Sequence, residues 1–196
     1  YWFVKTVFLS FHLRSSWRHM AHHLEIDWTE RLEPFKWDHI WQLVLLPAAV
    51  ESESREVIEE SLASLSRSKW PKERMIVVLS LEDRNPDVRA LGASLLEKHR
   101  GDFGSFLVTY HPDGLEGELR GKGANETWAI RKAQSLIDEK KIPHENIIVS
   151  SFDIDSKLFD QFFLCLTWHF LTAEQPHRSS FQPIPLYHNN IWDVGA

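Results

Sequence analysis

The stretch WQLVLLPAAVESESREVIEESLASLSRSKWPKERMIVVLSLED, residues 41–83, decides the fold. It opens with an apolar run, residues 41–48, of the kind found in buried strands. Residues 53–68 follow with apolar side chains at helical spacing, and a second apolar run, residues 73–83, predicts another strand. The helical stripe consists of Val57, Ile58, Leu62 and Leu65. This order predicts two parallel strands joined by a right-handed helical crossover.

The same alternation continues along the chain. We expect helices over 86–100, 125–141 and 159–173 and strands over 103–111 and 145–155. Asn125 is a favourable N-cap for the second of these helices. The chain is therefore predicted to be an α/β protein with a mainly parallel sheet flanked by helices.

Composition narrows the class of protein. The chain has 196 residues, of which 43% are hydrophobic, enough for one sizeable core. Its net charge of −6 provides no basic field for nucleic acid, so we expect no nucleic-acid partner. The single cysteine, Cys165, excludes an internal disulfide and is expected to be a core residue.

The N-terminal segment leaves two interpretations open. Residues 1–13 are strongly apolar, and residues 14–23 are basic and aromatic. They suit the end of a membrane-spanning helix at a cytoplasmic interface, or an amphipathic helix packed on the domain. The apolar run alone is shorter than the roughly 20 residues that span a bilayer. Residues 24–41 contain Pro34 and are predicted to be a connector.

Two histidines in this segment, His19 and His23, are four residues apart, a spacing that can bind zinc. No glutamate follows as in a zinc-protease helix, so an interfacial polar face is the favoured interpretation.

The stretch IIVSSFDIDSKLF, residues 147–159, places Asp153 and Asp155 directly after an apolar run. In an extended segment two such side chains share one face, where their charges repel each other. Mg²⁺ or Mn²⁺ accepts oxygen ligands and would compensate this repulsion. A solvated turn, with Asp155 or Ser156 capping the next helix, is the structural alternative.

A long segment with four glycines lies before the helix expected at 125–141. Lys122 and Arg120 lie in it, close to a helix N-terminus that would favour a phosphate group. A flexible loop with incidental charge is the alternative. The glycine spacing matches neither a Walker A loop nor a dinucleotide fingerprint.

Taken together, the segments LVLLPAAVES, MIVVLSLEDR, RGKGANETWA and VSSFDIDS resemble the inverting glycosyltransferases of family 2. The likeness covers residues 43–173. It implies a GT-A type nucleotide-diphospho-sugar transferase domain, incomplete at its C-terminus. Such a domain transfers a sugar from a nucleotide-sugar donor to a glycan, lipid or polysaccharide acceptor, with Mg²⁺ or Mn²⁺. Many members are joined to membrane helices, which implies a membrane-associated protein with its catalytic domain on the cytoplasmic side.

The resemblance also implies roles for individual residues. Asp153 and Asp155 match the DxD pair that holds the metal on the donor diphosphate. The implied donor-binding residues are Pro47, Glu51, Glu82, Lys122, Asn125 and Asp153. The chain departs from the family pattern at two positions, with Ala49 in place of an aromatic residue and Val50 in place of asparagine. The nucleotide base of the donor is therefore left open.

No residue matches the catalytic base of the family. The chain starts at Tyr1 instead of methionine, so we expect a fragment whose base lies beyond Ala196. The expected organisation is a membrane-proximal helix and connector over 1–41, a nucleotide-sugar-binding domain over 42–178, and the start of an acceptor-side region over 179–196.

Two other functions remain as alternatives. Phosphatases of the haloacid-dehalogenase type also place a DxD pair after an apolar strand, but Lys157 stands where they have Thr or Val. A membrane-anchored binding module without catalytic activity is the second alternative, because no residue matches the catalytic base of the family.

Overall fold

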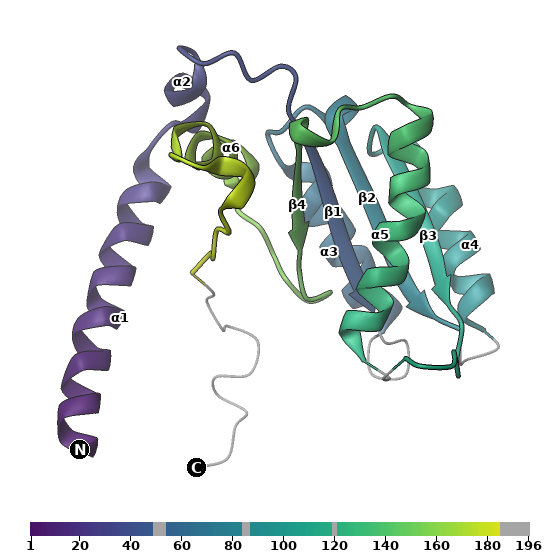
Figure 1. Cartoon of the computed structure of the whole chain (residues 1–196), viewed down its shortest axis with the longest axis horizontal. Coiled ribbons are helices and arrows are strands. Elements are labelled where there is room, and N and C mark those ends of the chain that lie inside the picture. The colour runs from purple at the N-terminus through teal and green to yellow at the C-terminus, as the bar shows by residue number, and fades with distance from the viewer. Residues whose placement is uncertain (49–53, 84–86, 119–120, 185–196) are drawn as a thin grey trace.

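The structure is a computed structural model that describes residues 1–48, 54–83, 87–118 and 121–184. At its centre lies a four-stranded sheet in the order β3-β2-β1-β4, and every pairing is parallel. The strands are β1 (Trp41–Ala48), β2 (Met75–Glu82), β3 (Ser105–His111) and β4 (Ile147–Ser151). Helices cover both faces (Figure 1). The predicted α/β class with a parallel sheet is confirmed.

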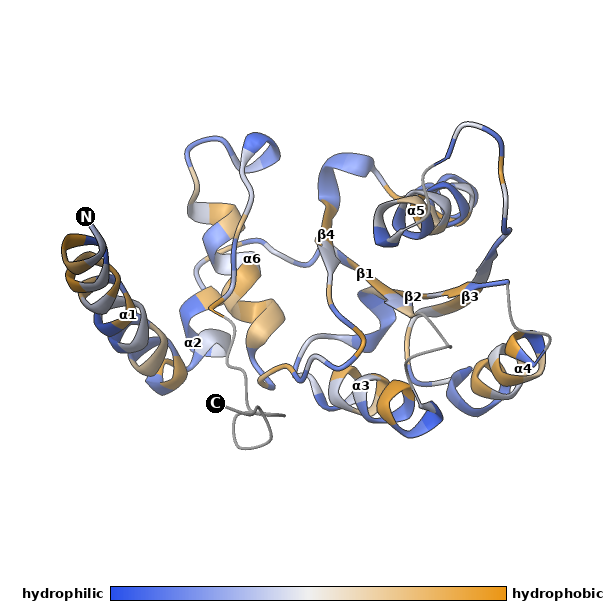
Figure 2. Cartoon of the chain, turned by 90° about the horizontal axis from the view of Figure 1, so that it is seen from below, coloured by the Kyte–Doolittle hydropathy of each residue, from blue (hydrophilic) through white to orange (hydrophobic). Residues whose placement is uncertain are grey.

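Three crossover helices connect these strands. Two of them, α3 (Arg55–Arg67) and α4 (Val88–His99), lie on one face of the sheet, while α5 (Lys122–Glu139) lies alone on the other (Figure 2). This arrangement follows from β1, whose side chains are apolar on both sides. Val44 and Leu46 pack in the cluster with α3, whereas Leu43 and Leu45 pack with α5. A strand buried on both faces needs such a continuous apolar run.

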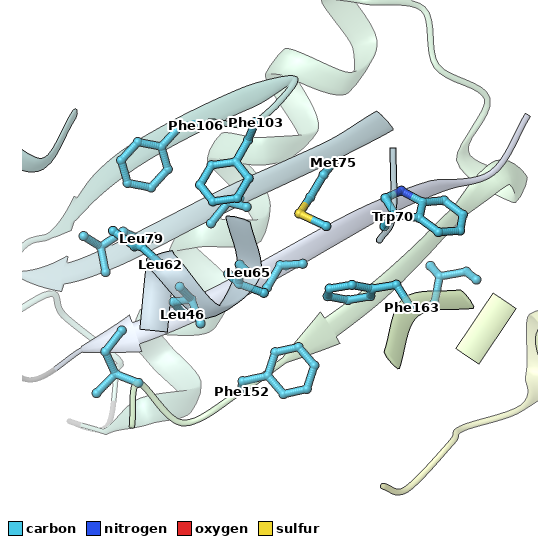
Figure 3. Close-up of a cluster of buried hydrophobic side chains, with 14 of the residues drawn as sticks. Leu46, Leu62, Leu65, Trp70, Met75, Leu79, Phe103, Phe106, Phe152 and Phe163 are labelled. Atoms are coloured by element: carbon cyan, nitrogen blue, oxygen red, sulfur yellow. The ribbon is translucent and has the colours of Figure 1, made fainter. Parts of the chain in front are cut away.

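The larger cluster lies on the α3 side and extends from β3 to α6 (Phe162–Thr172). Figure 3 shows Leu46, Leu62, Phe152 and Phe163 converging there. Phe152 follows β4 and Phe163 belongs to α6, so the cluster joins the C-terminal helix to the sheet. Three short 3-10 helices lie at Lys72–Arg74, His144–Asn146 and Pro176–Arg178.

The N-terminal segment forms α1 (Trp2–Glu25), a helix of 24 residues that extends away from the sheet (Figure 1). No residue of α1 is buried by the part of the chain that the structure describes. Its last turn contacts α6, where the His23 ring lies 5.3 Å from the His169 ring, so both interpretations of this segment stay open. Among the described helices, none is both long enough and apolar enough to cross a membrane.

Three expectations about element ends and connectors were wrong. The connector expected over 24–41 contains a short helix, α2 (Trp28–Leu32), because the Asp27 side chain caps it by accepting a hydrogen bond from Thr29 N. The helix α5 begins three residues before Asn125, which is inside the helix and is not its N-cap. The strand β4 ends at Ser151, so the two aspartates follow the strand and are not part of it.

Gly104 lies where two backbone segments approach closely before β3. Its N–H donates to the Lys72 carbonyl at 2.6 Å, and an added Cβ would lie 2.3 Å from the Glu73 carbonyl oxygen. At Gly101, three residues earlier, an added Cβ meets nothing within 4 Å among the described residues.

We predict that Gly104→Ala lowers the free energy of unfolding by about 1–3 kcal/mol, because the backbone must move to admit the methyl group. Gly101→Ala should change it by less than about 1 kcal/mol. Urea unfolding followed by circular dichroism measures both. Equal stability of the two variants would contradict the close approach.

Candidate functional site

The sheet order locates a candidate site at the carboxyl ends of the strands. The order reverses at β1, since β2 and β3 lie on one side of it and β4 on the other. Ligands of open α/β sheets bind outside the carboxyl ends at such a reversal. The end of β4 and the start of α5 both lie at this edge (Figure 1).

The residues after β4 form an acidic turn, residues 152–156. Phe152 N donates to the Leu45 carbonyl at 3.1 Å, and Ser156 N donates to the Asp153 carbonyl at 2.9 Å. Phe152 and Ile154 are buried in the core. Asp153 and Asp155 alternate with them and are exposed. The two carboxylates are thus both on the solvent side, although the segment is a turn and not the extended strand that was expected.

Lys122, the first residue of α5, contacts the acidic turn. Its ammonium group forms an ion pair with the Asp153 carboxylate and lies 3.8 Å from the Glu126 carboxylate. Glu126 also accepts a hydrogen bond from Ser151 Oγ at 2.6 Å. These contacts join the N-terminus of α5 to the end of β4. They bring together the lysine and the aspartate that the sequence singled out separately, and they add Glu126 and Ser151, which it did not.

Asp155 has no hydrogen bond or ion pair with any described residue. Exposed carboxylate oxygens on one turn are the hard ligands that Mg²⁺ and Mn²⁺ prefer, so the residues present fit such a cation. Within the described ranges, the pair does not belong to a group of three or more possible protein ligands. Mg²⁺ typically takes one or two carboxylates and completes its shell with water and substrate phosphates.

Asn125, one turn into α5, is buried and bonded to the sheet. Its Nδ2 donates to the Ser80 carbonyl at 3.0 Å, and the Ser80 hydroxyl donates to its Oδ1. Thr109 Oγ1 in turn donates to Ser80 Oγ at 3.0 Å. The network ties the first turns of α5 to β2 and β3. Sequence reasoning missed Ser80 and Thr109, whose signal was only a polar residue within each apolar run.

The other predicted residues are at different depths. Pro47 is buried in β1 beside Ser80, its register partner in β2. Glu82 ends β2 at the same edge of the sheet, and its neighbour Asp83 is paired with Arg89. Glu51 lies outside the described residues, as do Ala49, Val50 and Arg120.

No protein-family profile matches the chain, and no curated protein sequence matches it. Some solved structures do. TarS from S. aureus has 20% identity over 67% of this chain and 19% of its own, with a TM-score of 0.46. A shorter TarS structure in complex with UDP-GlcNAc has 20% identity over 67% of this chain and 31% of its own, with a TM-score of 0.45.

The mannosyltransferase PcManGT from Pyrobaculum calidifontis, in complex with GDP-Man and Mn²⁺, has 17% identity over 80% of this chain and 39% of its own, with a TM-score of 0.44. The chain therefore spans between about a fifth and two fifths of the length of these structures. Likenesses of this size do not assign a function to the chain.

We predict that Asn125→Ala lowers the free energy of unfolding by about 1–3 kcal/mol, because the Ser80 carbonyl and hydroxyl lose their buried partner. Gln134→Ala is the matched control, since Gln134 is exposed on the same helix and its loss should cost less than about 0.5 kcal/mol. Thermal unfolding measures both. An unchanged melting temperature for Asn125→Ala would contradict the network.

Proposed function

We propose that the chain is the donor-binding part of an inverting glycosyltransferase of family 2 with a GT-A type domain. It would bind a nucleotide-sugar together with Mg²⁺ or Mn²⁺ and pass the sugar to a glycan, lipid or polysaccharide acceptor. The observation that carries this proposal is the contact between Lys122 and Asp153 at the carboxyl edge of the sheet. This contact brings the Lys122 ammonium group, which suits a phosphate, next to the Asp153 carboxylate, which suits a cation.

The roles follow from charge and position. Asp153 and Asp155 would hold the cation, which when bound neutralises the charge that develops on the leaving diphosphate. Lys122 supplies a second positive charge at the N-terminus of an 18-residue helix, where free N–H groups also favour a phosphate. Glu126 holds the ammonium group near the turn. The reaction also needs an acid–base residue to accept the proton of the attacking acceptor hydroxyl, and no described residue is assigned to that role.

The remaining donor contacts are also proposals. Glu51 and Glu82, which follow or end neighbouring strands, would contact the nucleoside. Asn125 and Pro47 are buried, so they would position the edge of the site from beneath instead of touching the donor. In this proposal the glutamates bind the donor, and the buried residues position the backbone beneath it.

Calorimetry of the chain with UDP or GDP and Mn²⁺ tests the proposal. We predict metal-dependent binding that Asp155→Asn weakens by about tenfold or more, equivalent to at least about 1.4 kcal/mol. Asp160→Asn is the matched control, because it removes the same charge from an exposed position of the same segment. It should leave the affinity unchanged.

Two outcomes would overturn the proposal. One is the absence of metal-dependent nucleotide binding by the folded chain. The other is hydrolysis of p-nitrophenyl phosphate that Asp153→Asn abolishes, which would instead indicate a phosphatase.

We further propose that α1 associates with a membrane surface, with the α/β domain on the cytoplasmic side. Large apolar side chains are exposed along its first 17 residues: Trp2, Phe3, Val4, Val7, Phe8, Leu9, Phe11, Leu13 and Trp17. Exposed apolar side chains gathered on one segment mark a surface that binds a membrane or a partner. Lys5, Arg14 and Arg18 precede the first acidic residue, Glu25, so the charge favours anionic lipids.

We predict that the chain co-sediments with phosphatidylserine-containing vesicles and that Phe11→Glu weakens this binding by about tenfold or more, because a buried phenyl contributes about 1.5–3 kcal/mol. Ile130→Glu is the control, since Ile130 is an exposed apolar residue of α5. Equal losses for both variants, or no binding by the parent chain, would contradict a role for α1.

A further inference from the structure

Three possible metal ligands meet where α1 ends against α6. They are the imidazoles of His23 and His169 and the thiol of Cys165, and one ligand atom from each lies within 4.8 Å of the others. His23 is in the last turn of α1, while Cys165 and His169 are four residues apart on α6. All three are partly buried. The cluster lies on α1 and α6 and uses no residue of the acidic turn.

The helix α6 presents its two ligands from a fixed position. Residues four apart lie on one face of a helix, so Cys165 and His169 are neighbours by geometry. Between them, Thr167 points to the sheet and accepts a hydrogen bond at 3.0 Å from Gln42 Nε2 of β1. Both Gln42 and Thr167 are fully buried. The α6 half of the cluster is therefore anchored to the central strand.

His23 is also held in place. The Trp28 indole donates to the His23 carbonyl at 2.9 Å, and Trp28 N donates to Gln161 Oε1 at 2.7 Å, at the start of α6. The His23 ring lies 5.3 Å from the Trp28 ring and 5.3 Å from the His169 ring, measured between centroids. The end of α1 is thus directed at the two ligands on α6.

We propose that His23, Cys165 and His169 form a zinc site that fastens α1 to the α/β domain. Zinc binds imidazole nitrogen at about 2.0–2.1 Å and thiolate sulfur at about 2.3 Å, which places tetrahedral ligands about 3.3–3.6 Å apart. Ligand atoms that lie within 4.8 Å of one another need to approach by at most about 1.5 Å to reach this spacing. A water molecule or a fourth side chain would complete the tetrahedron.

The chemistry of these three ligands determines which metal ion they prefer. One thiolate and two imidazoles are soft to borderline ligands that suit zinc and disfavour Mg²⁺ and Ca²⁺. Burial is the main cause that lowers the pKa of both His23 and His169. Burial also raises the pKa of the Cys165 thiol to about 11. Binding replaces the thiol proton with the metal and releases the proton to solvent.

The site also meets a structural need of α1. Because α1 has no buried residue among those described, hydrophobic packing does not determine its orientation. A metal bridge between α1 and α6 restrains it at one end. The sequence indicated only the His19 and His23 pair, whereas the structure gives His23 its partners on α6.

Titration of the reduced full chain with Co²⁺ and Zn²⁺ tests this site. We predict one equivalent of Co²⁺ with the visible bands of a tetrahedral ion and a thiolate-to-cobalt charge-transfer band, both removed by Zn²⁺. Cys165→Ser should abolish the charge-transfer band, and His169→Ala should lower the zinc affinity by at least about 100-fold, more than removal of an outer-shell partner does. His22→Ala is the matched control, because His22 is the exposed neighbour of His23, and it should bind zinc like the parent chain.

The acidic turn provides a second control. Asp155→Asn should leave the cobalt spectrum unchanged, because carboxylates give no thiolate band. A parent chain that shows no thiolate-to-cobalt band would overturn the proposal even if the variants failed to fold. Equal loss of zinc affinity in His22→Ala and His169→Ala would also overturn it.

Discussion

The parallel pairing of β1 with its two neighbours is the constraint from which the rest of the structure follows. Leu45 is paired with Val78 on one side and with Ser151 on the other. Parallel strands cannot be joined by tight turns, so α3 and α5 must cross the sheet, and they cover its opposite faces. Each strand then ends at the same edge. The site at that edge is a consequence of the topology, because the segments that carry its charges must start there.

The elements of the fold were predictable because strands buried on both faces leave continuous apolar runs, and the helices between them carry an apolar stripe. Their ends were harder to predict. Asn125 has the chemistry of an N-cap, but its side chain bonds to Ser80 of β2 instead, and the helix begins earlier at Lys122. Tertiary hydrogen bonds to strands distant in sequence outweighed a local capping preference. No pattern within the helix itself contains that information.

The site was predictable where it depends on alternation. Phe152 and Ile154 are buried, and Asp153 and Asp155 follow each of them on the exposed side. This alternation of buried and exposed residues continues the strand pattern past the end of β4. The resemblance placed Lys122 and Asp153 in one donor-binding site, but their direct ion pair followed only from the structure, which brings α5 back to the end of β4. The hydrogen bond between Ser151 and Glu126 could not be predicted, since neither residue belongs to a recognisable motif.

The two ends of the described chain differ in how they are held. Residues of α6 pack into the larger core cluster and bond to β1 through Gln42 and Thr167, so α6 moves with the sheet. Among the described residues, the end of α1 is bonded to the body where the Trp28 indole donates to the His23 carbonyl, and the exposed apolar residues from Trp2 to Trp17 lie nearer the N-terminus. A restraint at His23 would hold this end of α1 to α6, which is itself bonded to β1.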